Sequence, residues 1–253
     1  MQPGTIDAFV KSWLATFGGS STAQSVVDVT PTPSETKSRL VLSPVGTLSV
    51  FDFQTPIPYP FGLERTGLLI SDFDAGVGAA RAAGADLVVS PFPDPIGRDA
   101  VVQFPGGINT QLYWHTKAPS YAALASVPEN RVYLSPDAAA GFLKSYLGFT
   151  GGKVDSDNPK ADSAELGIPG GAFRRVAVES PFGKALIVVT DGHLPYPFGR
   201  EVTGYAVPDV AATLTKASAA GAKTLWGPTQ ANGRATALVQ FPGGYIAEIH
   251  SGQ

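Results

Sequence analysis

The sequence predicts an α+β protein built from tandemly duplicated βαβββ units, four in all, of which the first lacks its leading strand. Two observations predict this fold class. The chain repeats itself at a nearly constant spacing, and the pattern of each copy predicts the order strand, helix, three strands twice. We expect the first copy at residues 1–119, with units 1–58 and 59–119, and the second at 120–253, with units 120–195 and 196–253.

The repeat rests on motifs that recur without a gap. Tyr59-Pro-Phe-Gly62 recurs as Tyr196-Pro-Phe-Gly199, and Phe104-Pro-Gly-Gly107 recurs as Phe241-Pro-Gly-Gly244, both 137 residues later. Near the start the spacing is 133, where Phe9-Val-Lys-Ser-Trp-Leu14 matches Phe142-Leu-Lys-Ser-Tyr-Leu147. Matches at one spacing over so many positions predict a tandem duplication.

The second copy shows the unit order most clearly. Its apolar spacing and turn residues predict a strand, a helix and three strands, twice over. Asp209 suits an N-cap, and Gly221 suits the left-handed residue that closes a helix. The expected elements of the first of its two units are a strand at 131–134, a helix at 137–147 and strands at 163–168, 173–179 and 184–190. Those of the second are a strand at 203–207, a helix at 209–220 and strands at 223–226, 236–241 and 245–250.

The first copy repeats this order with one omission. Its second unit gives a strand at 66–70, a helix at 72–83 and strands at 86–90, 99–104 and 108–114. Its first unit starts directly at a helix, residues 6–17, with no leading strand before it. A trimmed N-terminus and a strand lent by another subunit are two explanations that the sequence leaves open.

Composition narrows the function classes. Of 253 residues 43% are hydrophobic and only 15% charged, which excludes intrinsic disorder and allows two domains or one large one. A net charge of −3 makes nucleic acid an unexpected partner, and no apolar run is long enough for a membrane span. Without cysteine there are no thiolate metal sites and no disulfides. No signal-peptide pattern opens the chain, so we expect a cytoplasmic location.

Paired βαβββ units, with a Pro-Gly-Gly turn before a last strand that holds a glutamate, resemble the vicinal oxygen chelate superfamily. That family includes glyoxalase I, extradiol dioxygenases and the bleomycin and fosfomycin resistance proteins. The strongest match is Ala237 to Ile249, preceded by Val207-Pro-Asp209 and Ala220-Gly-Ala222. The resemblance implies two curled-sheet half-barrel domains, each around a cleft in which a divalent metal ion binds two adjacent oxygens of a small substrate.

The family's ligand positions are only partly kept. The last-strand carboxylate lies four residues after the turn glycine, which gives Glu248 in the second copy and Gln111 in the first. The first-strand ligand, usually histidine, lies seven residues before the aspartate that opens the helix. The resemblance assigns that position to Asn130, Val202 and Arg65, and the remaining last-strand positions to Val50 and Ile187. The metal site is therefore expected to be degenerate, with Glu248 as its surviving ligand.

Several side chains have both a functional and a structural interpretation. Glu248 is expected to be a catalytic base or metal ligand, or else a relic hydrogen-bonded inside the barrel. Strand alternation places His250 on the same face, where it could move a proton or simply lie exposed at the chain end. Glu64 and Glu201 lie one residue before the first-strand position and would reach the cleft if the strand slipped by one residue. Arg98 and Arg234 read as turn-anchoring salt bridges or as anion binders.

The expected substrate-binding residues lie around the two clefts. The Tyr-Pro-Phe-Gly segments join the units of each copy, so their aromatic rings either wall the cleft mouth or staple the connection onto the core. Residues of the first-strand and last-strand positions complete the set. The expected substrate-binding residues are Tyr59, Phe61, Gln111, Tyr113, Asn130, Tyr196 and Phe198.

Three functional hypotheses follow. In the first, the protein is a glyoxalase- or dioxygenase-like enzyme, a lyase, isomerase or dioxygenase, that acts on a small oxygenated compound with Glu248, His250 and one divalent metal ion. In the second, it is a metal-free protein that binds or sequesters a small molecule, as the resistance proteins do. In the third, one copy is a scaffold for the other. A small-molecule ligand is the expected partner, and a homodimer is left open.

Overall fold

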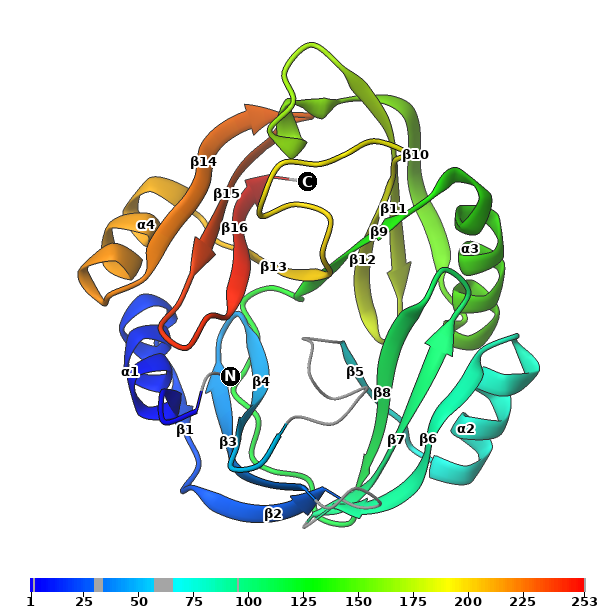
Figure 1. Ribbon diagram of the computed structural model, residues 1–253, viewed down its shortest axis with the longest axis vertical. Helices are drawn as coiled ribbons and strands as arrows, with labels where there is room; N and C mark the ends of the chain where they lie inside the picture. The colour runs from blue at the N-terminus through cyan, green and yellow to red at the C-terminus, as the bar shows by residue number, and fades with distance from the viewer. Residues whose placement is uncertain (2, 30–33, 57–65, 95, 253) are drawn as a thin grey trace.

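The computed structural model describes residues 1, 3–29, 34–56, 66–94 and 96–252 and confirms the predicted α+β class with βαβββ units. Four groups of strands form a ring in Figure 1, and the four helices lie on its outside. No helix in the described part of the chain is long and apolar enough to cross a membrane.

The strands of the second copy form one continuous curled sheet of eight strands, ordered β10-β11-β12-β9-β13-β16-β15-β14. Its first unit contains β9 (Glu129–Leu134), α3 (Pro136–Thr150), β10 (Lys153–Asp162), β11 (Ala172–Ser180) and β12 (Gly183–Val189). Its second unit contains β13 (Val202–Ala206), α4 (Val210–Ala219), β14 (Lys223–Ala231), β15 (Arg234–Gln240) and β16 (Ile246–Gly252). The leading strands β9 and β13 pair with each other and join the two units.

In the first copy the same strands fall into two separate sheets. The first unit has α1 (Ile6–Phe17), β1 (Ser20–Ser21), β2 (Ser25–Val29), β3 (Ser34–Ser43) and β4 (Gly46–Phe53). The second has β5 (Gly67–Leu69), α2 (Phe73–Ala82), β6 (Asp86–Asp94), β7 (Gly97–Phe104) and β8 (Ile108–His115). Among the described residues no strand precedes α1, as predicted. No described strand therefore pairs with both β4 and β5 in the way that β9 pairs with both β12 and β13 in the second copy.

The helices begin where the sequence predicts. The side chains of Asp72 and Asp209 accept hydrogen bonds from the backbone amides of Ala75 and Ala212, at 3.0 and 2.9 Å. These bonds satisfy amides that a helix leaves unpaired in its first turn. The helices then pack across the copies, α1 beside α4 and α2 beside α3 (Figure 1). The two largest apolar clusters therefore each combine one unit from each copy.

One predicted element is wrong. Residues 163–168 do not form a strand, because Ser163–Leu166 is a short 3-10 helix, opened by the Asp162 side chain and closed by Gly167 at a φ of 73°. The strand of that unit is β10, which precedes the helix and pairs with β11. Because β10 is an edge strand with almost every residue exposed, its sequence is polar and lacks an apolar pattern.

Candidate functional site

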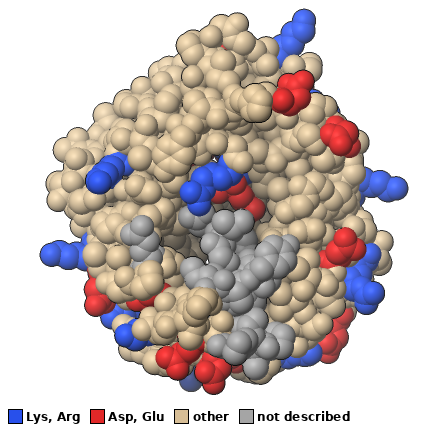
Figure 2. Space-filling model, viewed as in Figure 1, with Lys and Arg blue, Asp and Glu red and all other residues tan. Residues whose placement is uncertain are grey.

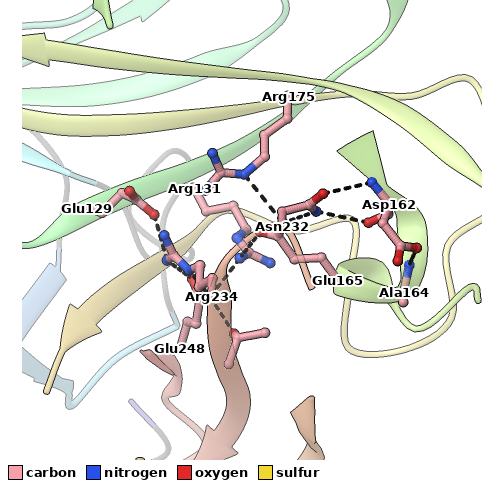
Figure 3. A network of polar contacts seen from close by, with 10 residues as sticks. Glu129, Arg131, Asp162, Ala164, Glu165, Arg175, Asn232, Arg234 and Glu248 are labelled. Carbon is pink, nitrogen blue, oxygen red and sulfur yellow. Dashed lines mark hydrogen bonds and ion pairs between the residues drawn. The ribbon is translucent and has the colours of Figure 1, made fainter. Parts of the chain in front are cut away.

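A buried carboxylate, Glu248 on β16, lies inside the curled sheet of the second copy (Figure 3). Arg131 on β9 donates from Nη2 to its Oε1 at 2.7 Å. Arg234 on β15 donates from Nη2 to Oε2 at 2.9 Å and from Nε to Oε1 at 3.1 Å. The hydroxyl of Thr236 also donates to Oε1. Both oxygens of the carboxylate are therefore bound by guanidinium groups, which form the strongest type of protein hydrogen bond.

Two further carboxylates balance the charge of the arginines. Glu165 accepts from Arg131 at 2.9 Å, lies 3.3 Å from Nε of Arg175 and accepts from Asn232 at 2.8 Å. Glu129 accepts from Arg234 at 2.7 Å. We call these six charged residues the ion-pair cluster: Glu129, Arg131, Glu165, Arg175, Arg234 and Glu248. Its three arginines and three glutamates are all buried, so the cluster is electrically neutral as a whole.

Strand alternation brings the cluster together. Glu129 and Arg131 lie two residues apart on β9, as do Arg234 and Thr236 on β15, so each pair shares a face of the sheet. Opposite them, β13 has Gly204, which pairs with Glu248. A Cβ at Gly204 would lie 3.0 Å from Oε2 of Glu248 and 3.3 Å from Nη2 of Arg234. The absence of a side chain there provides the space that the cluster fills.

The cluster fixes the protonation of its members. Burial by itself would raise the pKa of Glu248, but the charges of Arg131 and Arg234 outweigh it and hold that pKa well below the usual range. His250, two residues along β16, is only 5% exposed, and burial lowers its pKa to about 4 although Glu248 opposes the shift. At neutral pH we therefore expect Glu248 to be ionised and His250 to be neutral.

A cavity of about 1190 Å³ is lined mainly by residues of the first copy and also by residues of the second, Asn130 and Tyr205 among them. Its residues include Gln111, Tyr113 and His115, three alternate residues of β8, and the buried Asp99 on β7. Gln111 donates from Nε2 to Oδ2 of Asp99 at 3.0 Å. Figure 2 shows a hollow near the centre of this face, with basic and acidic side chains gathered beside it.

Two polar groups of β8 in this cavity, Tyr113 and His115, are expected to be neutral at pH 7. Burial raises the pKa of Tyr113 to about 12, so its hydroxyl keeps its proton. Burial also lowers the pKa of His115, an effect that Asp94 opposes. Nε2 of His115 lies 2.8 Å from the hydroxyl of Tyr121, while Nδ1 is buried and has no hydrogen-bond partner among the described residues.

Comparison with known proteins supports the βαβββ architecture of the chain. No protein-family model matches the chain, and no curated protein matches it in sequence. Among solved structures, a mutant of 4-hydroxymandelate synthase from Streptomyces coelicolor matches over 98% of this chain and 90% of its own, with a TM-score of 0.64 and 14% identity. The 2,3-dioxygenase LapB from Pseudomonas sp. KL28 matches over 99% and 89%, with a TM-score of 0.57 and 12% identity.

A fusion protein of a xylose isomerase-like TIM barrel and 4-hydroxyphenylpyruvate dioxygenase also matches, over 99% of this chain and 47% of its own, with a TM-score of 0.58 and 13% identity. The chain has the vicinal oxygen chelate fold. The predicted resemblance is thereby confirmed for the architecture, including its curled half-barrel sheets.

The metal that the vicinal oxygen chelate fold implies does not fit the residues around Glu248. Both carboxylate oxygens are engaged by Arg131 or Arg234 within 3.1 Å, and these guanidinium groups would repel a divalent cation. The described residues contain no group of three or more His, Asp or Glu side chains arranged to hold a metal ion. We therefore derive no chemistry from a metal at this position.

The other predicted site residues lie in different places. Asn130 lines the cavity, and its neighbour Arg131 is the β9 residue that contacts Glu248. Tyr196 is 69% exposed, whereas Phe198 is buried and packs edge-on against Trp226 with ring centroids 5.0 Å apart. Tyr59, Phe61, Glu64 and Arg65 lie outside the described residues.

The structure shows the contacts of Glu201, Arg98 and Arg234, for which the sequence allowed a functional or a structural role. Oε1 of Glu201 lies 3.3 Å from the backbone amide of Thr66, at the start of β5. Arg98 forms an exposed salt bridge with Asp74 at 3.1 Å, whereas Arg234 is fully buried in the ion-pair cluster.

Sequence reasoning missed four of the six members of the ion-pair cluster, Glu129, Arg131, Glu165 and Arg175. A signal exists for Arg131, because Asn130-Arg-Val-Tyr-Leu134 places an arginine in a strand that the fold buries on both faces. A charged residue in a buried strand needs a partner of opposite charge. No comparable local pattern marks Glu165, which lies in the short 3-10 helix.

Proposed function

We propose that the protein binds a small, largely apolar organic molecule that carries hydrogen-bonding groups, in the cavity lined mainly by the first copy and without a metal ion at Glu248. The observation that carries the proposal is the contrast between the two interiors. The second copy has the buried ion-pair cluster around Glu248, whereas the equivalent Gln111 of the first copy lines a cavity of about 1190 Å³ that residues of both copies enclose. That volume is of the size of known small-molecule sites.

The chemistry of the walls supports this ligand class. Strands β3 and β4 contribute apolar surface, including Leu40, Phe51 and Phe53, and Phe92 adds a ring from β6. Polar groups also line the cavity, among them Tyr113 on β8, which offers a hydroxyl donor, and the charged Arg39 and Lys184. Apolar walls with a few placed polar groups are typical of sites for small organic ligands.

Metal-assisted lyase, isomerase or dioxygenase chemistry at Glu248 receives less support. A catalytic carboxylate needs an oxygen free to bind the metal or to accept a proton, and both oxygens of Glu248 are engaged by arginine. The solved relatives are named as a synthase and dioxygenases, but their identity to this chain is at most 14% and carries only the fold.

The proposal is tested by binding of a neutral fluorescent probe, N-phenyl-1-naphthylamine, followed by its displacement with a panel of hydroxylated aromatic compounds. We expect one saturable site per chain. In Tyr113→Phe, displacement by hydroxylated members should weaken by about 3- to 10-fold, the cost of one hydrogen bond, while the probe itself should bind as before.

Tyr196→Phe is the matched control, since it removes the same hydroxyl from an exposed tyrosine that does not line the cavity. Its affinities should equal those of the unaltered protein. Absence of saturable probe binding would refute the proposal. Turnover of a panel compound that depends on an added divalent ion and is lost in Glu248→Gln would replace it with the enzymatic hypothesis.

A further inference from the structure

The curled sheet of the second copy has two edge strands that come from different units. Strand β10 pairs with β11 and ends the sheet on one side, and β14 pairs with β15 and ends it on the other. In Figure 1 these edges lie at the upper right and the upper left of the ring. The short 3-10 helix Ser163–Leu166, which follows β10, packs beside β14. The two edges therefore approach each other where β10 ends.

One side chain, that of Asn232, connects these two edges. It lies in the two-residue turn between β14 and β15, in which Ala231 pairs with Arg234. Its φ is 52° and that of Gly233 is 76°, and the type I′ turn that suits hairpins requires a positive φ at both positions. Asparagine tolerates this conformation and glycine adopts it readily. The turn thus holds Asn232 at the tip of the hairpin.

Three hydrogen bonds join Asn232 to the other edge (Figure 3). Its Oδ1 accepts from the backbone amide of Asp162, the last residue of β10, at 2.8 Å. Its Nδ2 donates to the carbonyl of Asp162 at 3.0 Å and to Oε2 of Glu165 at 2.8 Å. One side chain therefore bonds both backbone groups of Asp162, as a neighbouring strand would. We call these three hydrogen bonds the clasp.

The clasp requires an amide rather than a carboxylate. Glu165 belongs to the ion-pair cluster, in which its Oε1 accepts from Arg131 at 2.9 Å. Its Oε2 accepts from Nδ2 of Asn232, which is a neutral donor. An ionised carboxyl group at position 232 has no donor and would place a second negative charge beside Oε2 of Glu165. Conversion of this one amide into an acid therefore removes two of the three bonds of the clasp and adds a repulsion.

The sequence at the clasp allows that conversion. Asn232 is followed by Gly233, and glycine has no Cβ to hinder attack by its own backbone nitrogen. That nitrogen can form a bond to Cγ of Asn232 as the bond from Cγ to Nδ2 breaks. The proton of the Gly233 amide leaves with Nδ2 as ammonia, and a cyclic imide remains. Water then opens the imide at either carbonyl and yields aspartate or isoaspartate, with no change of oxidation state.

We propose that Asn232 is a deamidation site controlled by the clasp, and that its conversion opens this edge of the second copy irreversibly. While the clasp is closed, three hydrogen bonds hold both polar atoms of the amide, and Cγ cannot turn toward the nitrogen of Gly233 without breaking them. The reaction therefore proceeds from a locally opened state. Its product cannot close the clasp again, because the donor Nδ2 has left as ammonia. The turn acts as a one-way conformational switch.

The rate of conversion tests the control by the clasp. The unaltered full chain is incubated at mildly alkaline pH, either folded or unfolded in guanidinium chloride, and peptide mapping by mass spectrometry follows each asparagine. We expect Asn232 to convert about 10- to 1,000-fold more slowly in the folded chain, the range for breaking three hydrogen bonds of ordinary strength. The asparagines that do not precede glycine are the internal controls: Asn109, Asn130 and Asn158. In the unfolded chain they should convert more slowly than Asn232, and Asn158 precedes Pro159, which has no amide proton to release.

Two variants test the effect of the product. Asn232→Asp has the carboxylate of the product, and Asn232→Gly keeps the turn conformation but removes the side chain. Hydrogen exchange at the amide of Asp162 should become about tenfold faster or more in both, because repulsion from Glu165 displaces the acceptor in the first and the second has none. Asn158→Asp is the matched control. Oδ1 of Asn158 accepts from the amide of Lys160 at 3.0 Å, and an aspartate keeps that oxygen, so exchange at Asp162 should not change.

The outcomes decide the proposal. Equal rates of conversion in the folded and unfolded chain would overturn control by the clasp, and slowing beyond the expected range would overturn the switch, because the clasp then never opens. Unchanged exchange at Asp162 in Asn232→Asp and Asn232→Gly would overturn the role of the clasp. Asp162, Glu165 and Asn232 do not line the cavity, so the neutral probe should bind to both variants as before. Loss of probe binding would mean that the whole chain opens rather than one edge, and would also overturn the proposal.

Discussion

The two copies of this chain place different groups at equivalent positions of the same fold. The repeat spacing of 137 aligns Glu248 with Gln111, Thr236 with Asp99 and Arg234 with Gly97. It also aligns His250 with Tyr113. The hydrogen bond between β15 and β16, from Thr236 to Glu248, has its counterpart between β7 and β8, from Gln111 to Asp99. The copies therefore share a cross-strand polar pair and differ in what surrounds it.

The residues around this cross-strand polar pair determine whether the space beside it is filled by side chains. In the second copy, guanidinium groups from β9 and β15 fill the space and cancel the carboxylate charge. In the first copy, Gly97 is equivalent to the arginine of β15, and among the described residues no strand corresponds to β9, which supplies the other arginine. The same polar pair therefore lies in a buried ion-pair cluster in the second copy and beside a cavity in the first.

The largest difference between the copies should appear when the central polar group is truncated. Glu248→Ala leaves Arg131 and Arg234 partly unpaired in a buried site, which costs about 3–5 kcal/mol of unfolding free energy. The matched Gln111→Ala removes one hydrogen bond beside a cavity and should cost about 1 kcal/mol. Urea denaturation of both variants measures the contrast. Equal losses would show that the cluster does not stabilise the second copy.

Acid should destabilise the second copy through His250, which Tyr113 replaces in the first. The pKa of His250 is lowered to about 4 in the folded protein, against about 6.5 in the unfolded chain. Between these values the unfolded chain binds the extra proton, so stability falls as pH decreases. The accumulated loss is about 3 kcal/mol at pH 4.

The lowered pKa of Glu248 acts in the same direction but at lower pH. Its contribution to stability is present above about pH 4.5, the pKa of the unfolded carboxyl, and is lost as pH falls below that value. Denaturation series from pH 7 to pH 4 on the unaltered protein and on His250→Gln measure the first effect. The variant should lose most of the slope above pH 4.5, and a slope retained in full would contradict the assignment to His250.

Space at the cluster should be as important as charge. Gly204→Ala introduces a Cβ 3.0 Å from Oε2 of Glu248 and 3.3 Å from Nη2 of Arg234, and should cost about 1–3 kcal/mol. Gly78→Ala is the control, because its Cβ meets nothing within 4 Å and a helix favours alanine, so stability should rise by about 0.4–1 kcal/mol. Thermal unfolding measures both changes in stability, the expected loss in Gly204→Ala and the expected gain in Gly78→Ala. A neutral Gly204→Ala would mean that the cluster can move aside.

Most of the fold could be predicted from sequence because it is encoded locally and written more than once. Asp72 and Asp209 cap their helices through bonds to residues three positions ahead, which a short window of sequence contains. Strand β10 could not be predicted in this way. It holds Pro159 and polar residues along an exposed edge, and only its pairing with β11 makes it a strand.

The candidate site could be predicted only where one motif specifies it. The turn glycine Gly244 fixes the position of Glu248 four residues later. The partners of Arg131 are 34 and 117 residues away along the chain, at Glu165 and Glu248, so no local pattern announces the pairing. The predicted division at residues 119 and 120 and the catalytic roles of Glu248 and His250 stay predictions.

The smallest expected effect is that of a divalent metal ion on the second copy. An ion that bound the folded protein at 100 times its dissociation constant would add about 2.7 kcal/mol of stability and raise the melting temperature. Because Arg131 and Arg234 already neutralise Glu248, we expect 1 mM Mn²⁺ to shift the melting temperature by less than about 1 °C. Glu248→Gln provides the comparison. A larger shift of the melting temperature in the unaltered protein that is absent in this variant would show that Glu248 can bind a metal ion in place of Arg131 and Arg234. The second copy would then have a usable metal site, and the contrast between the two interiors would be wrong.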